Sequence, residues 1–348
     1  MLFKKSLESG RTTKCGVAIL NFRGAGVIVH EAPYYEKLSW PATVQYAKSV
    51  EEAGFDSGWI VDHFMLGQEN AIFESWTSLS YLAAVTSKIR LGPFVLCNSY
   101  RNPALVAKMA TTLDIASGGR LYLGLGAGWH GEEYAAYGYR FPSARERVDS
   151  LRESLSVIKM MFTQDVSSFN GKYVHIENAV NRPQPLQKPH PPIMVGAYGD
   201  RMLRLIAEEA DGWCISGLPG DPSDATPDAF RKRSEYLDRC CEKIGRNPQE
   251  IDRIWTGHVI IAADNAAAKR RVEFVRDKIT RAVDSGEMMK VDPDHMIQSF
   301  VRGTPAECLS QMKELCSAGA SNFVLYFDDF PGTGGLELFS SSVLPRLP

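Results

Sequence analysis

The chain has 348 residues, of which 44% are hydrophobic and 23% are charged, values that are ordinary for a globular protein. Its 39 basic and 41 acidic residues give a formal net charge of −2, so nothing in the charge balance favours nucleic acid or a membrane surface as a partner. No run of about 18 apolar residues occurs, and residues 1–14 lack the apolar core of a signal peptide, so we expect a cytoplasmic protein.

The first half of the chain alternates short apolar runs with longer amphipathic segments. The short runs predict strands over residues 15–20, 58–61, 89–96 and 121–125, and the longer ones predict helices over 42–53, 75–85 and 145–162. A further helix should begin at Asn102-Pro103, because Asn can cap a helix and Pro at its first position loses no hydrogen bond.

Residues 163–192 interrupt this alternation. They hold five prolines and a short stretch around Asn170-Gly171, which predict a hairpin followed by an extended, Pro-rich crossing of the surface. The alternation then resumes with strands predicted over residues 193–195, 212–215, 254–262 and 322–326. Helices are predicted over 201–210, 228–244, 266–282 and 305–317, and a Gly-rich tail is expected after the last strand.

Eight strand-then-helix units without a break in composition predict a single (β/α)₈ barrel domain over residues 1–348. Insertions are expected at about residues 163–192, 216–227 and 283–303. The alternative is a pair of open α/β halves joined near residues 163–192. In a barrel of this class the chemistry lies where strands end and loops begin, so the residues that follow each strand are the candidates for a site.

Cysteine and histidine are spaced without a metal or redox motif. The seven cysteines include no C-x-x-C pair, so we predict buried free thiols. The seven histidines include no H-x-H or H-E-x-x-H, which argues against a metal-dependent hydrolase, and no bound metal is expected.

Polar residues follow the second and third predicted strands. His63, within Asp62-His63-Phe64, is placed where a histidine can touch a cofactor and move protons near neutral pH, although a histidine hydrogen-bonded inside a loop is the alternative. The third strand runs into Phe94-Val95-Leu96-Cys97-Asn98-Ser99, whose polar atoms could meet the edge of a flat heterocycle. On spacing alone, a strand end satisfied by turn residues explains that segment better.

The fourth strand ends in Gly124-Leu125-Gly126-Ala127-Gly128-Trp129. Three glycines at alternate positions leave room for a ligand or for a crowded backbone. They match a dinucleotide G-x-G-x-x-G only loosely, because the third glycine comes one residue early. Glu132 and Glu133 follow, and paired acids can act as general acid and base, but the exposed start of a helix explains them better.

The fifth strand ends in Gly196-Ala197-Tyr198-Gly199-Asp200, and a helix follows at once. A Gly-containing turn into a helix presents free N–H groups and the positive end of the helix dipole, which together suit a phosphate. The alternative is that Asp200 caps the helix and occupies the same N–H groups. The residues leave both interpretations open.

Several of these segments belong to a larger set of motifs spread along the chain. In order, they are Asp62-His63-Phe64, Glu74-Ser75-Trp76-Thr77, Ile89-Arg90-Leu91-Gly92, Tyr100-Arg101-Asn102-Pro103, Thr112-Leu113-Asp114, Ser117-Gly118-Gly119-Arg120, Gly124-Leu125-Gly126-Ala127-Gly128-Trp129, Val195-Gly196-Ala197 and Ala210-Asp211-Gly212-Trp213. Over nearly its whole length the chain thereby resembles the bacterial luciferase-like superfamily of flavin and deazaflavin oxidoreductases, and most of all its branch that depends on coenzyme F420.

The resemblance implies a barrel with coenzyme F420 lying across the carboxyl ends of the strands. It implies a non-proline cis peptide at Phe94–Val95 against the ring, and a contact at Cys97, where relatives often carry Thr or Asn. The cofactor phosphate would lie at Gly196–Gly199. The cofactor-binding residues would be His63, Phe94, Val95, Cys97, Gly126, Gly128, Glu132, Gly196, Ala197, Tyr198 and Gly199.

The implied reaction is hydride transfer between the deazaflavin and a carbonyl, imine or alkene, with His63 as the proton donor or acceptor. Sugar-oxidising relatives carry a carboxylate directly after the Gly-rich strand end, whereas this chain has Trp129, which would instead shape an apolar substrate pocket. Substrate recognition would fall on residues 64–73, 163–192, 218–227 and 283–303. The alternatives are an FMN-dependent monooxygenase and a flavin-binding protein without turnover, and the resemblance implies a homodimer.

Overall fold

A barrel of parallel strands forms the centre of the protein. The computed structural model describes residues 11–22, 38–216, 226–285 and 292–348. Within this part of the chain the strand order is β3-β2-β1-β12-β10-β9-β8-β5-β4, and β11 pairs with β10 outside this path. The strand bounds are β1 (Lys14–Ala18), β2 (Ser57–Ile60), β3 (Arg90–Pro93), β4 (Leu96–Cys97), β5 (Leu123–Gly126), β8 (Ile193–Gly196), β9 (Gly212–Ser216), β10 (Asp252–Ile261), β11 (Val301–Gly303) and β12 (Asn322–Phe327).

The sheet closes between β3 and β5. A parallel bridge joins Leu91 to Leu121, just before β5, and β4 continues the same stretch of chain to pair with β5. Counting β3 and β4 as one interrupted strand, the ring has the eight predicted positions. The alternative of two open halves is wrong, because β5 and β8 lie on either side of residues 163–192 and pair directly in parallel.

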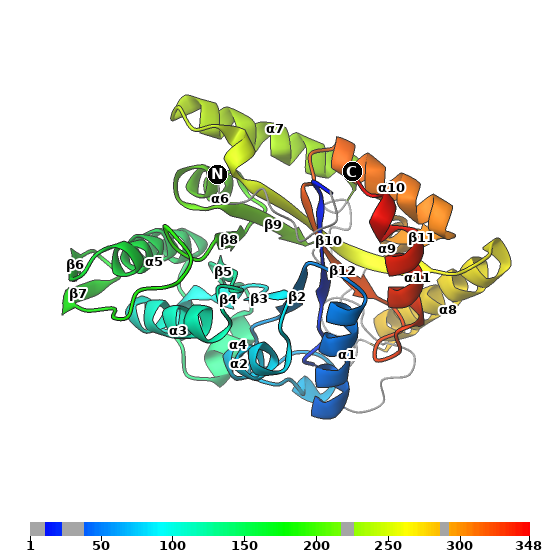
Figure 1. The fold of residues 1–348 in the computed structure, drawn as a ribbon, viewed down its shortest axis with the longest axis horizontal. Helices are drawn as coiled ribbons and strands as arrows, with labels where there is room; N and C mark the ends of the chain where they lie inside the picture. Colours follow the sequence, from blue (N-terminus) through cyan, green and yellow to red (C-terminus); the bar gives the residue numbers. More distant parts are fainter. Residues whose placement is uncertain (1–10, 23–37, 217–225, 286–291) are drawn as a thin grey trace.

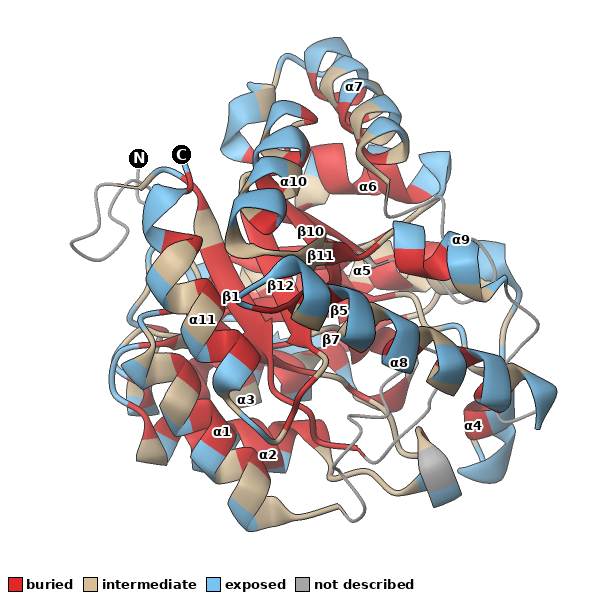
Figure 2. Cartoon of the chain, turned by 90° about the vertical axis from the view of Figure 1, so that its right-hand side faces the viewer, coloured by how far each residue is buried: buried red, intermediate tan, exposed pale blue. Residues whose placement is uncertain are grey.

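Helices surround the barrel and bury one face each against it (Figures 1 and 2). Helix α3 begins where the sequence places a capping residue: the Asn102 side chain accepts from Ala104 N, as expected from its position before Pro103. None of the helices in the described ranges has the length and apolar composition needed to cross a membrane. The helix bounds are α1 (Trp40–Glu52), α2 (Ser75–Val85), α3 (Pro103–Ala116), α4 (Gly131–Ala136), α5 (Ala144–Thr163), α6 (Asp200–Glu209), α7 (Pro227–Lys243), α8 (Asn265–Asp284), α9 (Pro293–Gln298), α10 (Pro305–Ser317) and α11 (Gly334–Ser342), with short 3₁₀ turns η1 (Gln68–Asn70), η2 (Asn98–Tyr100), η4 (Pro248–Glu250) and η5 (Leu344–Arg346).

The chain after β12 is a helix rather than the Gly-rich tail that was expected. Asp329 accepts a hydrogen bond from the backbone N–H of Gly335, and α11 starts there. Leu336 and Phe339 on α11 are fully buried, so this segment completes the core. The expectation failed because a Gly-rich composition alone does not show that Asp329 accepts the N–H group of Gly335, six residues later.

Residues 163–192 form the predicted hairpin and Pro-rich crossing. Strands β6 (Ser167–Asn170) and β7 (His175–Ala179) pair antiparallel. The crossing then runs past the amino ends of the barrel strands, where Gln187 donates to the carbonyl oxygen of Leu121 at 2.8 Å and to Asp114 at 2.7 Å. Arg90, at the start of β3, donates to the same glutamine. This insertion therefore belongs to the amino end of the barrel.

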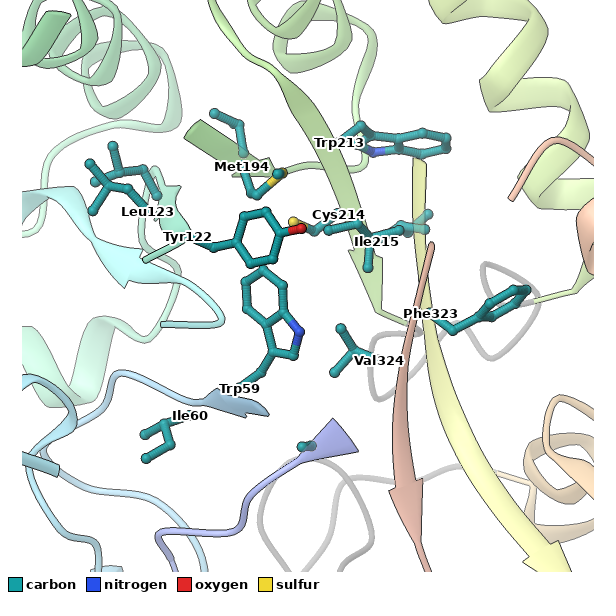
Figure 3. Packing of buried hydrophobic residues seen from close by; sticks show 14 of the residues in the cluster. Trp59, Ile60, Tyr122, Leu123, Met194, Trp213, Cys214, Ile215, Phe323 and Val324 are labelled. Atoms are coloured by element: carbon teal, nitrogen blue, oxygen red, sulfur yellow. The ribbon is translucent and has the colours of Figure 1, made fainter. Parts of the chain in front are cut away.

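Large side chains fill the barrel below its mouth. Trp59 and Tyr122 stack with their ring centroids 5.2 Å apart, and Met194 points toward the same group (Figure 3). Trp59 is 1% exposed and donates its indole N–H to Ser57 Oγ at 2.8 Å, so this large ring leaves no unpaired polar atom. The seven cysteines are free thiols, and six of them are buried, as predicted. With the lower interior filled, room for a ligand is left at the carboxyl ends of the strands.

Candidate functional site

A cavity of about 370 Å³ opens at the carboxyl ends of the barrel strands. Its volume and mostly apolar walls are typical of small-molecule sites. Of the predicted site residues, His63, Phe94, Val95, Cys97, Gly126, Gly128, Trp129, Gly196, Ala197, Tyr198 and Gly199 all line it. Glu132 does not, because its side chain is exposed on α4, and the neighbouring Glu133 lines the cavity in its place.

The interruption between β3 and β4 forms the floor of the cavity. The peptide bond between Phe94 and Val95 is cis, as the resemblance implied. The Val95 side chain lies across the ends of the neighbouring strands: a Cβ added at Gly126 would come within 2.7 Å of it, and one at Gly196 within 3.0 Å. Crowding by Val95 therefore explains these glycines, and the same missing side chains leave the space beside Val95 free.

Gly128 lets two polar groups approach the edge of this floor. Its φ is +81°, and a Cβ there would lie 2.1 Å from the Tyr134 hydroxyl oxygen and 2.8 Å from Cys97 Sγ. Those two atoms are 3.0 Å apart. Burial raises the pKa of the Cys97 thiol to about 11, so Cys97 presents a neutral, weakly polar group to the cavity at pH 7.

Asp62, two residues after β2, ties that part of the chain to Cys97 at the end of β4. It accepts the backbone N–H of Cys97 at 2.9 Å and two hydrogen bonds from Arg101, at 2.8 and 2.9 Å. Ser75 Oγ is a further donor. A buried carboxylate with this many donors is well compensated, and it fixes where His63, the next residue, leaves the strand.

Glu133 collects four hydrogen bonds at one end of the cavity. Its Oε1 accepts the backbone N–H groups of Phe64 and Met65, and its Oε2 accepts the Tyr100 hydroxyl and lies 3.0 Å from His63 Nδ1. Its side chain is fully buried. The expectation that Glu133 belongs to the exposed start of a helix is therefore wrong, although α4 does begin there. Glu132 fits that description.

The donors around Glu133 keep it ionised. Burial on its own raises the pKa of this carboxyl. The hydrogen bond from His63, the charge that His63 carries when it is protonated, and further donors that include Tyr100 and Met65 outweigh burial and lower the pKa to about 2. Sequence reasoning missed this residue as a partner of His63, because the contact joins positions 70 apart along the chain.

His130 and Trp129 stand beside this carboxylate at the rim. Their rings stack at 4.9 Å, and Trp129 is 46% exposed. His130 Nδ1 is buried 4.0 Å from Glu133 Oε2, too far for a hydrogen bond, and burial lowers the pKa of His130. Ligand atoms of His63, His130 and Glu133 lie within 4.8 Å of one another, close enough to hold a metal ion. Because the Glu133 oxygens already accept four hydrogen bonds, we describe the arrangement as a hydrogen-bonded pair, His63 and Glu133, with the His130 ring beside it.

Another part of the cavity wall, formed by the start of α6 and by Arg147, carries positive charge. Gly199 is the N-cap of α6, and no side chain among the described residues accepts from that helix end. The alternative in which Asp200 caps the helix is therefore wrong, because Asp200 is the first helical residue and is exposed. Arg147 on α5 also lines the cavity and donates to the Gly128 carbonyl oxygen at 3.1 Å. Sequence reasoning did not identify Arg147, since one arginine in an amphipathic helix carries no signal of its own.

The loops expected to recognise the substrate contribute unequally. Leu66, from residues 64–73, lines the cavity. No residue of 163–192 does, and that expectation is wrong because the segment contacts the amino ends of the strands. The described residues of 283–303 do not line it either, and residues 217–225 lie outside the described ranges.

Several known proteins are similar to this chain in sequence, and solved structures are similar to it in fold. Residues 14–322 match the family described as luciferase-like monooxygenase. The chain is 28% identical over 315 residues to an F420-dependent glucose-6-phosphate dehydrogenase of Amycolatopsis mediterranei, covering 87% of this chain and 93% of that protein. It is 29% identical over 340 residues to an F420-dependent hydroxymycolic acid dehydrogenase of Mycobacterium tuberculosis, covering 93% and 88%. Among solved structures, the F420-dependent tetrahydromethanopterin reductase of Methanopyrus kandleri superposes with a TM-score of 0.75 at 22% identity, covering 97% of this chain and 99% of that one.

Proposed function

Because the chain belongs to the luciferase-like monooxygenase family, we propose that it is an oxidoreductase that uses coenzyme F420 to transfer a hydride to or from a small organic carbonyl, imine or alkene. The names of its relatives support this choice, since dehydrogenases and reductases that depend on coenzyme F420 match most of its length. When bound, coenzyme F420 supplies a carbon centre that gives or accepts a hydride.

The shape of the cavity carries the proposal. At its floor, Gly126 and Gly196 present no side chains beside Val95, and a planar heterocycle needs such free space. His63 and Glu133 line this cavity together with Arg147 and the start of α6, where no described side chain caps the helix. These residues therefore fit a long, flat cofactor with an anionic tail.

Each group has a proposed role. Val95 and Phe94 support the ring, Cys97 and Gly128 border it, and Gly196–Gly199 with Arg147 hold the phosphate through N–H groups and positive charge. His63 exchanges a proton with the substrate oxygen or nitrogen. Holding both reactants across one cavity supplies much of the rate enhancement.

Trp129 favours an apolar substrate. It occupies the position where sugar-oxidising relatives carry a carboxylate, and its ring lies 5.5 Å from that of His63 at the rim. An exposed indole beside the proton-exchanging group offers a surface for stacking or apolar contact rather than for a sugar hydroxyl. We therefore propose that the substrate is a small organic molecule with an apolar body.

Cofactor titration tests the proposal directly. Purified protein is titrated with coenzyme F420 and, separately, with FMN, and binding is followed by fluorescence. We expect tight binding of coenzyme F420 and then oxidation of its reduced form by members of a carbonyl, imine and alkene panel. Tight FMN binding with no affinity for coenzyme F420 would replace the proposal with an FMN-dependent monooxygenase. Binding without turnover of any panel member would favour a flavin-binding protein.

We also propose a homodimer, which the resemblance implies. Light scattering of the purified protein measures its mass against the 38.6 kDa of one chain. A mass equal to that of one chain across the working concentration range would refute this part of the proposal.

A further inference from the structure

The carboxylate of Glu133 lies directly behind the histidine proposed to exchange protons. We infer that Glu133 is the positioning residue of the site: it holds the Nδ1–H of His63 and so leaves His63 Nε2 unprotonated as the atom that takes the substrate proton. This inference rests on the proposed hydride-transfer function and names the residue that prepares its proton acceptor.

The hydrogen bond between His63 and Glu133 determines which tautomer His63 adopts. An ionised carboxylate only accepts hydrogen bonds. The 3.0 Å contact between Glu133 Oε2 and His63 Nδ1 therefore requires a proton on Nδ1. In a neutral imidazole the other nitrogen is then bare. His63 lines the cavity, and its Nε2 has no hydrogen-bond partner within the described part of the chain.

The position of Glu133 is fixed by the chain that carries His63. Its Oε1 accepts from Phe64 N and from Met65 N, at 2.8 Å for the latter, so the carboxylate is anchored to the two residues after the histidine. The Tyr100 hydroxyl holds Oε2 from the other side. Because the anchors and the histidine belong to one loop, the distance between carboxylate and imidazole is preserved if that loop moves.

Charge favours the same assignment. During oxidation of an alcohol, the hydroxyl proton moves to His63 Nε2 while the C–H bonding electrons leave with the hydride to the coenzyme, giving a carbonyl. His63 thereby becomes an imidazolium, and a buried carboxylate 3.0 Å away stabilises that charge. In reduction the same proton returns to the substrate oxygen.

The other titratable groups near His63 are already engaged or neutral. Asp62 is paired with Arg101 at 2.8 Å, and the Cys97 thiol faces Tyr134. His130 is the second imidazole near Glu133, and burial lowers its pKa, so it adds no competing positive charge at pH 7. Glu133 is thus the group within the described residues placed to respond to a charge on His63.

Glu133→Gln is the first variant, because it removes the charge while keeping the shape. Glu51→Gln is its matched control: Glu51 also accepts backbone N–H groups, from Ser87, Lys88 and Ile89, but near the amino end of β3 and with no histidine. We expect kcat of Glu133→Gln to fall about 10- to 100-fold with the Kd for coenzyme F420 changed less than about threefold. In the profile of kcat against pH for oxidation of an alcohol, the acid limb should move about one pH unit lower, because the imidazolium loses its counter-charge.

The control Glu51→Gln should keep kcat within about twofold of wild type. Its melting temperature should fall, because a carboxylate that accepts backbone N–H groups loses its charge. In the double variant His63→Gln/Glu133→Gln, activity should be no lower than in His63→Gln alone, since Glu133 acts through His63. Additive losses, or equal losses in Glu133→Gln and Glu51→Gln, would overturn the inference.

A second readout needs no turnover. In cofactor-free protein with ¹⁵N-labelled histidine, the His63 resonances, assigned by their loss in His63→Gln, should report a protonated Nδ1 and a bare Nε2 at pH 8. The opposite tautomer in the wild-type protein would reject the inference even if Glu133→Gln failed to fold. If the wild-type protein neither binds coenzyme F420 nor reduces any substrate, the proposed function fails, while this spectrum still decides the role of Glu133.

Discussion

The two ends of the barrel use similar strands for opposite purposes. At the lower interior, Trp59 and Tyr122 stack in van der Waals contact and fill the space between β2 and β5. At the carboxyl end, Gly126 and Gly196 sit where larger residues would collide with Val95, and a cavity remains above it. Residue size at a few strand positions therefore decides which end packs and which end binds.

Two carboxylates show the same contrast. Glu51 accepts three backbone N–H groups near the amino end of β3, and hydrogen bonds to Ser87, Lys88 and Ile89 outweigh the effect of burial and lower its pKa. Glu133 accepts two backbone N–H groups at the carboxyl end, and in addition meets an imidazole and a phenol. Both carboxylates accept the backbone N–H groups of a loop. Glu133 can take part in chemistry because it also contacts titratable side chains.

Replacing His63 should have the largest effect on the binding end. We expect His63→Ala to lower kcat about 10²- to 10⁴-fold, the range for loss of a general acid or base, with unfolding free energy changed by less than about 1 kcal/mol. Steady-state kinetics with the best panel substrate measures this. The control is His175→Ala in the exposed hairpin, which should leave kcat unchanged. Full activity in His63→Ala would remove proton exchange from this residue.

Truncating Trp59 should have the largest effect on the packed end. Trp59→Ala removes a fully buried ring and leaves a cavity, which costs about 3–5 kcal/mol of unfolding free energy. Urea denaturation measures the loss. A cost below about 1 kcal/mol would mean that the interior collapses around the missing ring, and the distinction between a packed and an open end would weaken.

A pair of glycine substitutions compares the ends directly. A Cβ at Gly92 would meet the Trp59 ring at 2.8 Å, and one at Gly126 would meet Val95 at 2.7 Å. Both alanine variants should lose about 1–3 kcal/mol of stability through overpacking. Only Gly126→Ala should also weaken coenzyme F420 binding, because Val95 is pushed into the cavity. Equal affinities in the two variants, measured by titration, would argue against Val95 as the floor of a cofactor site.

The pH dependence of stability should show the smallest effect. Because the pKa of Glu133 is about 2 in the folded protein and 4.5 ordinarily, its ionised form stabilises the fold above pH 4.5, and this contribution is lost as the pH falls toward 2. The contribution is about 1–2 kcal/mol once solvent relaxation is allowed for. The difference in urea midpoint between wild type and Glu133→Gln should therefore narrow between pH 6 and pH 3. A constant difference would mean that Glu133 stabilises by shape rather than by charge.

Local signals predicted most of the fold, and distant contacts limited the rest. Helices α2 and α10 have the bounds that the sequence pattern predicts, since that signal lies within each helix. The start of α11 depends on Asp329, and the role of Glu133 depends on a loop 70 positions earlier. Glu132 and Glu133 are chemically identical in sequence, and only tertiary packing decides which one turns inward.

The closure of the barrel has a consequence for its mouth. Between β3 and β5 the ladder is reduced to one bridge. The Gln187 side chain, from the Pro-rich crossing, bonds to residues on both sides of this bridge, to Arg90 and to the Leu121 carbonyl oxygen. The two strands are thus held together at their start by the backbone hydrogen bonds of this bridge, by a direct bond from Arg90 to the Leu121 carbonyl oxygen, and by a side chain from a remote insertion. Since β3 leads through Phe94 to Val95, a loss of the Gln187 contacts at the start of the strand would shift Val95 at its far end, and with it the floor of the cavity.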